Sequence, residues 1–270
     1  MQESKERKLG IFTWFGYRLP IMERIQLIRE TGFETVLHWW DDSFAEADGA
    51  TKETQVELIR NAGLFIENAH LQFSRANDLW RDTLDGAALF SRYLSDIDGL
   101  SEHGIPVAVL HPTSGATHPT TSPIGMKRVH MLVERAEKLG VRLAMENVRD
   151  THALIEILGS IASPMLGLCY DSGHDLIWGH TPPYEILEKY KDRLFAVHFH
   201  DNMGQNDDHI APGEGVLDWK KIKSAVDASV YQGSYTLEGD SAVIPPKRTP
   251  QEHLQMQFCG ARKMLFPRGR

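Results

Sequence analysis

Four glycines constrain the fold of this chain more than any other feature. Gly32, Gly63, Gly104 and Gly140 each end an amphipathic run, and each is followed at once by a short apolar run. Glycine just past a helix is the left-handed cap that turns the chain back toward a sheet. Successive glycines lie 31, 41 and 36 residues apart, which is about one strand and one helix per interval. The pattern predicts repeated strand–helix units.

Eight apolar runs in this pattern are predicted to be β-strands. They span residues 9–12, 33–37, 64–66, 105–110, 141–145, 165–170, 194–199 and 235–237. Runs with helical character follow them, among them 183–190, 219–226 after a capping Asp218, and 250–265. This alternation predicts an α/β fold, a single (β/α)8 TIM barrel that spans residues 1–270 as one domain. A doubly wound sheet would need a glycine-rich phosphate turn after its first strand, and Thr13-Trp14-Phe15-Gly16 is not one.

Charge and composition narrow the environment and the partners. The 270 residues include 29 Lys and Arg against 37 Asp and Glu, a net charge of −8, and no basic block stands out. This balance disfavours nucleic acid as a partner. The first eight residues lack the apolar segment of a signal peptide, and no apolar run reaches membrane-spanning length. Cys169 and Cys259 lie outside any CxxC motif, and Cys169 is predicted to be a buried thiol. We expect a soluble cytoplasmic protein with no membrane partner, and we leave homo-oligomers open.

Metal-ligating side chains follow most of the predicted strands. In a parallel barrel the carboxyl ends of all strands meet at one face, where catalytic residues lie. The residues at these ends are Trp14, His38, His70, His111, Glu146, Asp171, His198 and Glu238, and His174, Asp207 and His209 lie close by in the sequence. Carboxylates such as Glu146 and Glu238 directly beyond buried strands are costly without a positive partner, and a cation provides one. The conjunction predicts a divalent metal site, which no single residue would indicate.

Some of these residues also have a purely structural interpretation. A single histidine after a strand is usually a loop residue, and we keep that interpretation for His38. Asp171 precedes Ser172-Gly173, so it is also typical of a helix cap or a turn.

Other residues near the strand ends are interpreted as parts of a substrate pocket. Trp14, Trp39 and Trp40 would supply its apolar walls. His200 shares a strand face with His198, because side chains alternate along a strand, and it is placed beside the same pocket.

Five motifs of this chain resemble those of the xylose-isomerase-like TIM barrels. They are Glu146-Asn147, Tyr170-Asp171-Ser172-Gly173-His174, Val197-His198-Phe199-His200-Asp201, Gly213-Glu214-Gly215 and Leu237-Glu238. The resemblance runs along essentially the whole chain. That superfamily includes sugar isomerases and epimerases, related dehydratases, and nucleases of the endonuclease IV type. The resemblance is specific for the fold and the metal site, and much less so for the substrate.

In the sugar epimerase branch, the resemblance implies one divalent ion, Mn²⁺, Co²⁺, Mg²⁺ or Zn²⁺, held by Glu146, Asp171, His198 and Glu238. The two glutamates would also form the acid/base pair that moves a proton through a metal-stabilised enediolate. His174 would orient the substrate or a ligand. We therefore predict a metal-dependent isomerase or epimerase that acts on a small carbohydrate.

In the nuclease branch, the resemblance implies a zinc phosphodiesterase with three ions and nine ligands. The candidates are His70, His111, Glu146, Asp171, His174, His198, Asp207, His209 and Glu238. The acidic balance and the lack of basic loops argue against a DNA substrate. The sequence leaves open whether the additional histidines and Asp207 bind metal or substrate.

The chain departs from the epimerase pattern at one place. There an arginine often precedes the Pro-Gly turn and binds substrate, whereas here His209 takes that place. The departure argues against a free ketohexose. Arg75 and Arg149 could instead meet an acidic or phosphorylated substrate, and a surface position of either arginine stays open. A metal-dependent dehydratase or lyase acting on a sugar acid also stays open, as does a non-catalytic sugar-binding protein.

Overall fold

Eight parallel strands form the centre of the molecule. The computed structural model describes residues 7–149, 151–179, 184–240 and 248–266. The strands are β1 (Leu9–Phe12), β2 (Thr35–Trp40), β3 (Phe65–Leu71), β4 (Val107–Leu110), β5 (Arg142–Glu146), β6 (Leu166–Asp171), β7 (Leu194–His198) and β8 (Tyr235–Leu237). They pair in the order β7-β6-β5-β4-β3-β2-β1-β8. Phe199 closes the remaining gap, because its amide donates to the Thr236 carbonyl at 2.8 Å and its carbonyl accepts from the Glu238 amide at 3.0 Å. The predicted TIM barrel is confirmed.

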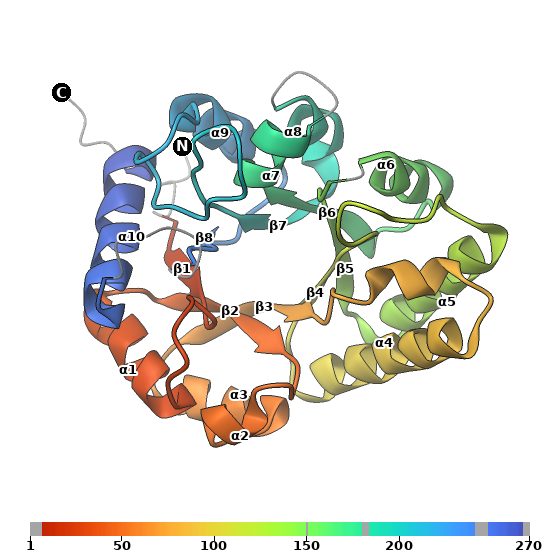
Figure 1. Cartoon of the computed structure of the whole chain (residues 1–270), viewed down its shortest axis with the longest axis horizontal. Helices are drawn as coiled ribbons and strands as arrows, with labels where there is room; N and C mark the ends of the chain where they lie inside the picture. Colours follow the sequence, from red (N-terminus) through yellow and green to blue (C-terminus); the bar gives the residue numbers. More distant parts are fainter. Residues whose placement is uncertain (1–6, 150, 180–183, 241–247, 267–270) are drawn as a thin grey trace, which may run out of the picture.

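Helices surround the strands as an outer ring (Figure 1). They are α1 (Ile21–Thr31), α2 (Ala45–Asp48), α3 (Lys52–Asn61), α4 (Leu84–Glu102), α5 (Pro123–Leu139), α6 (Thr151–Ser160), α7 (Ser172–Trp178), α8 (Glu185–Tyr190), α9 (Trp219–Asp227) and α10 (Pro250–Leu265), with 3₁₀ turns η1 (Ala76–Trp80) and η2 (Lys191–Arg193). Gly32, Gly63, Gly104 and Gly140 have φ angles of 108°, 81°, 62° and 71° where α1, α3, α4 and α5 end. These are the left-handed caps that the sequence predicted.

The other predicted helices agree closely with the structure. α9 and α10 begin at the predicted Trp219 and Pro250, and Asp218 caps α9 by accepting from the Lys221 amide at 3.1 Å. The helix predicted over 183–190 is α8, and position 183 lies outside the described residues. Among the described helices, none has both the length and the apolar character needed to cross a lipid bilayer.

Side-chain alternation along the strands decides which residues reach the site. The barrel interior is filled by a cluster of small buried residues, Val107, Val109, Ala144, Cys169 and Ala196. Two positions after four of these residues stand His111, Glu146, Asp171 and His198. The alternation therefore places these polar side chains directly above the apolar plug, at the carboxyl end of the barrel.

β2 and β3 extend further than the sequence predicted. The two strands stay paired as far as Trp40 and Leu71, which lie opposite each other. His38 and His70 are therefore inside strands rather than beyond them. His38 is fully buried, and its Nε2 donates to the Lys52 carbonyl at 3.0 Å, so it ties β2 to α3.

The position of Trp40 corrects the prediction that this residue lines the pocket. Trp40 is fully buried. Its ring packs closely over Gly99 of α4 and lies 5.8 Å from the His103 ring. Because β2 continues through this region, alternation turns Trp40 outward to the helices and leaves Trp39 facing the barrel mouth.

Candidate active site and metal centre

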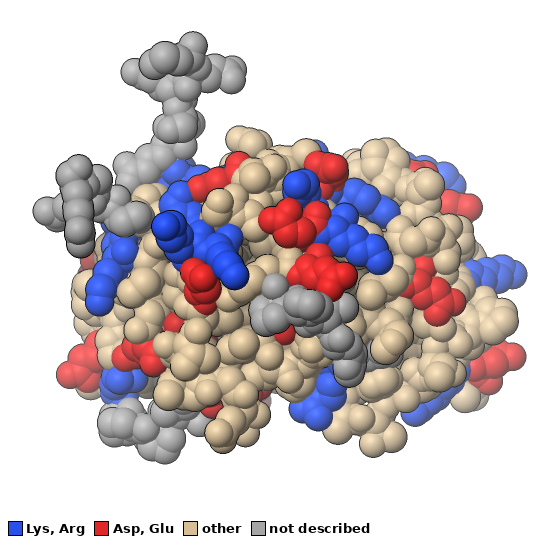
Figure 2. Space-filling view, turned by 90° about the horizontal axis from the view of Figure 1, so that it is seen from above, with Lys and Arg blue, Asp and Glu red and all other residues tan. Residues whose placement is uncertain are grey.

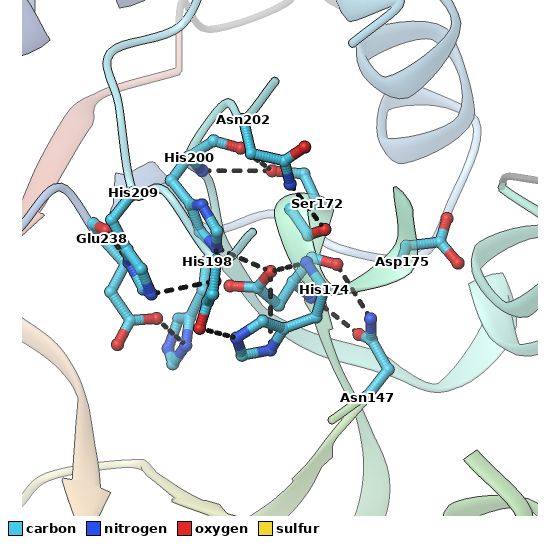
Figure 3. A network of polar contacts seen from close by, with 12 residues as sticks. Asn147, Ser172, His174, Asp175, His198, His200, Asn202, His209 and Glu238 are labelled. Carbon is cyan, nitrogen blue, oxygen red and sulfur yellow. Dashed lines mark hydrogen bonds and ion pairs between the residues drawn. The ribbon is translucent and has the colours of Figure 1, made fainter. Parts of the chain in front are cut away.

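Four strand-end residues converge above the barrel interior. Glu146, Asp171 and His198 are the last residues of β5, β6 and β7, and Glu238 directly follows β8. One ligand atom of each lies within 4.8 Å of those of the other three. The His198 Nδ1 is 3.1 Å from Glu146 Oε2. It is also 3.0 Å from Glu238 Oε2 (Figure 3). The structure therefore brings together the four residues that the epimerase resemblance implied as ligands.

Two further histidines form a second group with Glu146. His70 Nε2 and His111 Nε2 lie 3.2 and 3.4 Å from the same Glu146 Oε2. The His70 Nδ1 is 2.8 Å from the Leu71 carbonyl, which can only accept a hydrogen bond. This contact places the His70 proton on Nδ1 and leaves the Nε2 lone pair directed at the centre.

A third group lies on the β6–β7 side of the centre. It comprises His174, His200, Asp207 and His209. His174 Nε2 is 3.4 Å from Asp207 Oδ2, and His209 Nε2 is 3.2 Å from Asp207 Oδ1. His174 Nδ1 also lies 3.2 Å from Glu146 Oε1, so Glu146 takes part in contacts with all three groups.

His200 belongs to the third group but does not line the cavity, which corrects its predicted place in the substrate pocket. The side chain is fully buried, and its Nε2 is 3.0 Å from Asp171 Oδ1. Ser172 Oγ donates to the His200 carbonyl at 2.8 Å and accepts from its amide at 3.1 Å. β7 ends at His198, so the strand alternation on which the prediction relied does not continue to His200.

The chemistry of these groups fits a divalent cation. Buried atoms of the candidate ligands that have no hydrogen-bond partner include Glu146 Oε1, Asp171 Oδ2, His174 Nδ1, both ring nitrogens of His198, His200 Nε2, Asp207 Oδ1 and Glu238 Oε2. They approach one another closely without hydrogen-bond geometry, as ligands directed at a shared ion do. Imidazole nitrogens with carboxylate oxygens form the donor set preferred by Zn²⁺ and similar ions.

The charges of the centre keep its carboxylates ionised. Burial raises the pKa of Glu146, but His111 and His198 outweigh burial and hold this pKa well below its usual range. Burial likewise raises the pKa of Glu238, and His198 reverses the effect and brings it to about 2. Both glutamates therefore carry a negative charge at neutral pH, which a metal ligand or a general base requires.

A single buried aspartate holds the loop that presents Asp207 and His209. Asp201 Oδ1 accepts from the amides of Asn202 and Leu217 at 3.0 and 3.1 Å. Its Oδ2 accepts from the Gly213 amide and the Trp219 indole, both at 2.8 Å. This role of Asp201 could not be predicted from the sequence, because it depends on donors that are up to 18 residues away.

A cavity of about 1280 Å³ opens above the centre. Its floor includes ligand residues of each group, among them Glu146, His111, Asp207 and Glu238. The predicted pocket residues Trp14, Trp39 and Arg149 line it, and the Arg149 guanidinium lies 4.7 Å from the centroid of the Trp178 ring. Arg75 instead pairs with Asp78 and Asp85 on the surface.

Four aromatic wall residues were not predicted. Phe12 at the end of β1, Phe44, Phe73 and Trp178 line the cavity. Trp178 stands four residues after His174 on α7, and the two rings stack at 4.6 Å. Helical spacing from a candidate ligand was therefore a usable signal for Trp178, whereas Phe44 and Phe73 lie outside any regular helix or strand and gave none.

The fold and the groups of candidate ligands define a (β/α)8 barrel with a candidate metal centre at the carboxyl end of its strands. The chain belongs to the xylose isomerase-like TIM barrel family, whose model matches residues 25–257.

Two curated relatives illustrate the similarity in sequence. An uncharacterized protein, y4fM of Sinorhizobium fredii, is 29% identical over 194 residues, which cover 69% of this chain and 53% of that protein. Inosose dehydratase of Lacticaseibacillus casei is 28% identical over 144 residues, covering 45% of this chain and 47% of that enzyme. The match spans about half the length of each relative.

Solved structures share the fold over nearly the whole chain. An L-ribulose 3-epimerase superposes with a TM-score of 0.78 at 15% identity, covering 97% of this chain and 95% of that one. The IolI protein with a bound zinc atom gives 0.76 at 18% identity, covering 96% and 98%. At these identities the likeness establishes the fold and leaves the substrate open.

Proposed function

We propose that this chain is a divalent-metal-dependent carbohydrate isomerase or epimerase, with Glu146 and Glu238 as its acid/base pair. The observation that carries the proposal is the pair of ionised carboxylates on either side of His198 Nδ1, at the floor of the cavity. The names of the structural neighbours support it, since several are sugar 3-epimerases.

Different residues of the chain would carry out the separate steps of such a reaction. A cation held by Glu146, Asp171, His198 and Glu238 would acidify a C–H beside a carbonyl and stabilise the enediolate charge. Glu238 is the more accessible of the two glutamates, 13% exposed against 1% for Glu146, and would remove the proton. Glu146, on a strand nearly across the barrel, would return it. His174 would orient the substrate hydroxyls.

Deuterium exchange tests this proposal directly. Candidate sugars incubated in D₂O with the metal-loaded protein are expected to gain deuterium at the carbon next to the carbonyl. Glu146→Gln and Glu238→Gln should each abolish the exchange with the barrel still folded, because an amide cannot accept the proton. The exposed Glu30→Gln, on α1, is the matched control and should exchange normally. Full exchange by either active-site variant would refute the assignment.

A phosphodiesterase with three metal ions is the second candidate. It is favoured by one observation: of the five overlapping sets of candidate ligands among the described residues, three that contain or contact Glu146 together include all nine residues of the nuclease branch. Figure 2 shows basic and acidic side chains interspersed over one side of the barrel. The net charge of −8 disfavours a DNA backbone and supports the carbohydrate proposal. A duplex with an abasic site that stays uncut by protein saturated with zinc would eliminate the candidate.

A dehydratase is the third possibility, and the inosose dehydratase relatives favour it. The same carboxylate would remove the proton, and a hydroxyl on the neighbouring carbon would leave as water. The mass of the product distinguishes the two reactions. A dehydration product is lighter than the substrate by one water molecule, whereas an epimer has the same mass as the substrate.

A further inference from the structure

Cys169 is the member of the apolar plug beneath the centre that can form a side-chain hydrogen bond. The plug consists of Val107, Val109, Ala144, Cys169 and Ala196, and Phe195 packs against it. Apart from the cysteine, these side chains are hydrocarbon. Cys169 is fully buried, as the sequence predicted, and lies opposite Glu146 in β5 and Ala196 in β7. Its thiol has no part in the proposed reaction.

The Cys169 sulfur lies next to the candidate ligand His198. A ring nitrogen of His198, a carboxylate oxygen of Glu146 and the Cys169 sulfur all lie within 4.8 Å of one another. His198 Nδ1 faces the carboxylates of Glu146 and Glu238, at 3.1 and 3.0 Å. Because the two nitrogens of an imidazole ring face different ways, Nε2 is directed away from these carboxylates. The thiol and the ring are within hydrogen-bonding reach of each other.

The other histidines of the centre show what His198 lacks. His70 Nδ1 lies 2.8 Å from the Leu71 carbonyl. His209 Nδ1 lies 2.6 Å from the Glu238 carbonyl. Such a contact places the ring proton on the nitrogen that faces the carbonyl and leaves the other nitrogen free to bind a metal. Among the described residues, no oxygen or nitrogen atom accepts a hydrogen bond from either ring nitrogen of His198, and both are buried.

We infer that Cys169 is a positioning residue, whose sulfur accepts a hydrogen bond from His198 Nε2–H and keeps the Nδ1 lone pair directed at the metal ion. A histidine binds a metal through an unprotonated nitrogen, so its proton lies on the other one. Burying that N–H without an acceptor is costly, and the Cys169 sulfur is the acceptor that the plug offers. The inference rests on the proposed function in one respect, that His198 holds a metal ion.

Zinc titration against a competing chelator tests the inference without requiring turnover. Cys169→Ala should raise the dissociation constant for zinc by about 10- to 100-fold, the range for losing a partner that orients a ligand. Cys169→Ser keeps an acceptor and should recover most of the affinity. Val109→Ala removes more volume from the same plug but no hydrogen-bonding atom. It should lower the stability and leave the zinc affinity unchanged.

The absorption spectrum of the cobalt-loaded protein distinguishes a positioning role from direct binding of the ion. A thiolate bound to cobalt gives a charge-transfer band in the near ultraviolet, and we expect none. A band that disappears in Cys169→Ser would show that Cys169 is itself a ligand and would overturn the inference. Equal losses of zinc affinity in Cys169→Ala and Val109→Ala, or no recovery in Cys169→Ser, would also overturn it.

Zinc binding and deuterium exchange keep the two proposals apart. Zinc bound as tightly by Cys169→Ala as by the unmutated chain would reject the role of Cys169 and leave the proposed function standing. Weaker zinc binding by Cys169→Ala, with no exchange on any sugar by the unmutated chain, would uphold that role and reject the reaction. An unmutated chain that binds no zinc would reject both.

Discussion

At the scale of single residues, the absence of a side chain at Gly173 shapes the centre. A Cβ at this position would collide with the His200 ring, which lies against Asp171 and stacks on His209 at 3.9 Å. His200 is held in the space that Gly173 leaves open, and its Nε2 lies 3.0 Å from Asp171 Oδ1. Although His200 is also a candidate ligand of the third group, we predict that it acts as a positioning residue that orients the Asp171 carboxylate toward a metal ion.

Gly173→Ala is therefore expected to lower the metal content per chain and the thermal stability, although alanine is the better helix former by about 0.5–1 kcal/mol. Elemental analysis and thermal melting measure the two effects. Adding His200→Ala removes the ring and should restore much of the stability without restoring the metal. Normal metal content in Gly173→Ala alone would show that His200 has no positioning role.

His38 gives a prediction for pH. Burial lowers the pKa of His38 to about 4, so the unfolded chain binds more protons at this site between pH 6.5 and 4. Stability from this residue is therefore full above pH 6.5 and decreases as the pH falls, by roughly 2 kcal/mol at pH 5. His38→Gln can still donate to the Lys52 carbonyl and has no such proton. Urea unfolding at pH 7 and pH 5 should show a smaller loss for the variant, and equal losses would contradict the assignment.

At the scale of elements, close packing of η1 against α5 depends on Gly125. A Cβ there would collide with the Trp80 indole, whose Nε1 donates to the Pro112 carbonyl at 2.7 Å. Gly125→Ala should destabilise the protein by about 1–3 kcal/mol, the range for overpacking. Gly159→Ala in α6, where an added Cβ meets nothing within 4 Å, is the matched control and should be neutral or slightly stabilising. Chemical denaturation measures both, and equal effects would refute the packing argument.

Element boundaries were predictable where their signals are local. Residues 9–12, 235–237 and 250–265 agree with β1, β8 and α10, and α10 has a proline at its start and a Thr249–Glu252 capping box. β2 and β3 were predicted too short. The second halves of β2 and β3 contain His and Trp residues, which the sequence pattern placed at or beyond the strand ends. These halves stay extended because the two strands pair with each other.

At the scale of the whole molecule, the centre was predictable because strand order and alternation send Glu146, Asp171 and His198 to one face. The sequence could not place residues beyond regular elements. Asp201 acts through a long loop, and the cavity wall combines residues from segments that only the closed barrel brings together. The positions of these residues depend on closure of the barrel, which local sequence patterns do not encode.

The ligand groups join segments from β3 to β8, so metal should stabilise the entire barrel. A cation that binds only the folded chain adds about 2.7 kcal/mol at a hundred times its dissociation constant. At about 2–4 °C per kcal/mol, chelator-treated protein should gain roughly 5–10 °C in Tm when zinc or manganese is returned. His198→Ala should lose most of this gain.

Elemental analysis then counts the ions. His111→Ala and Asp207→Ala should each remove about one ion per chain if all three groups bind metal. Neither variant should remove an ion if only the four strand-end residues bind metal. A Tm that is unchanged by metal in the unmutated chain would show that these groups hold no ion, and the proposed reaction would fall with it.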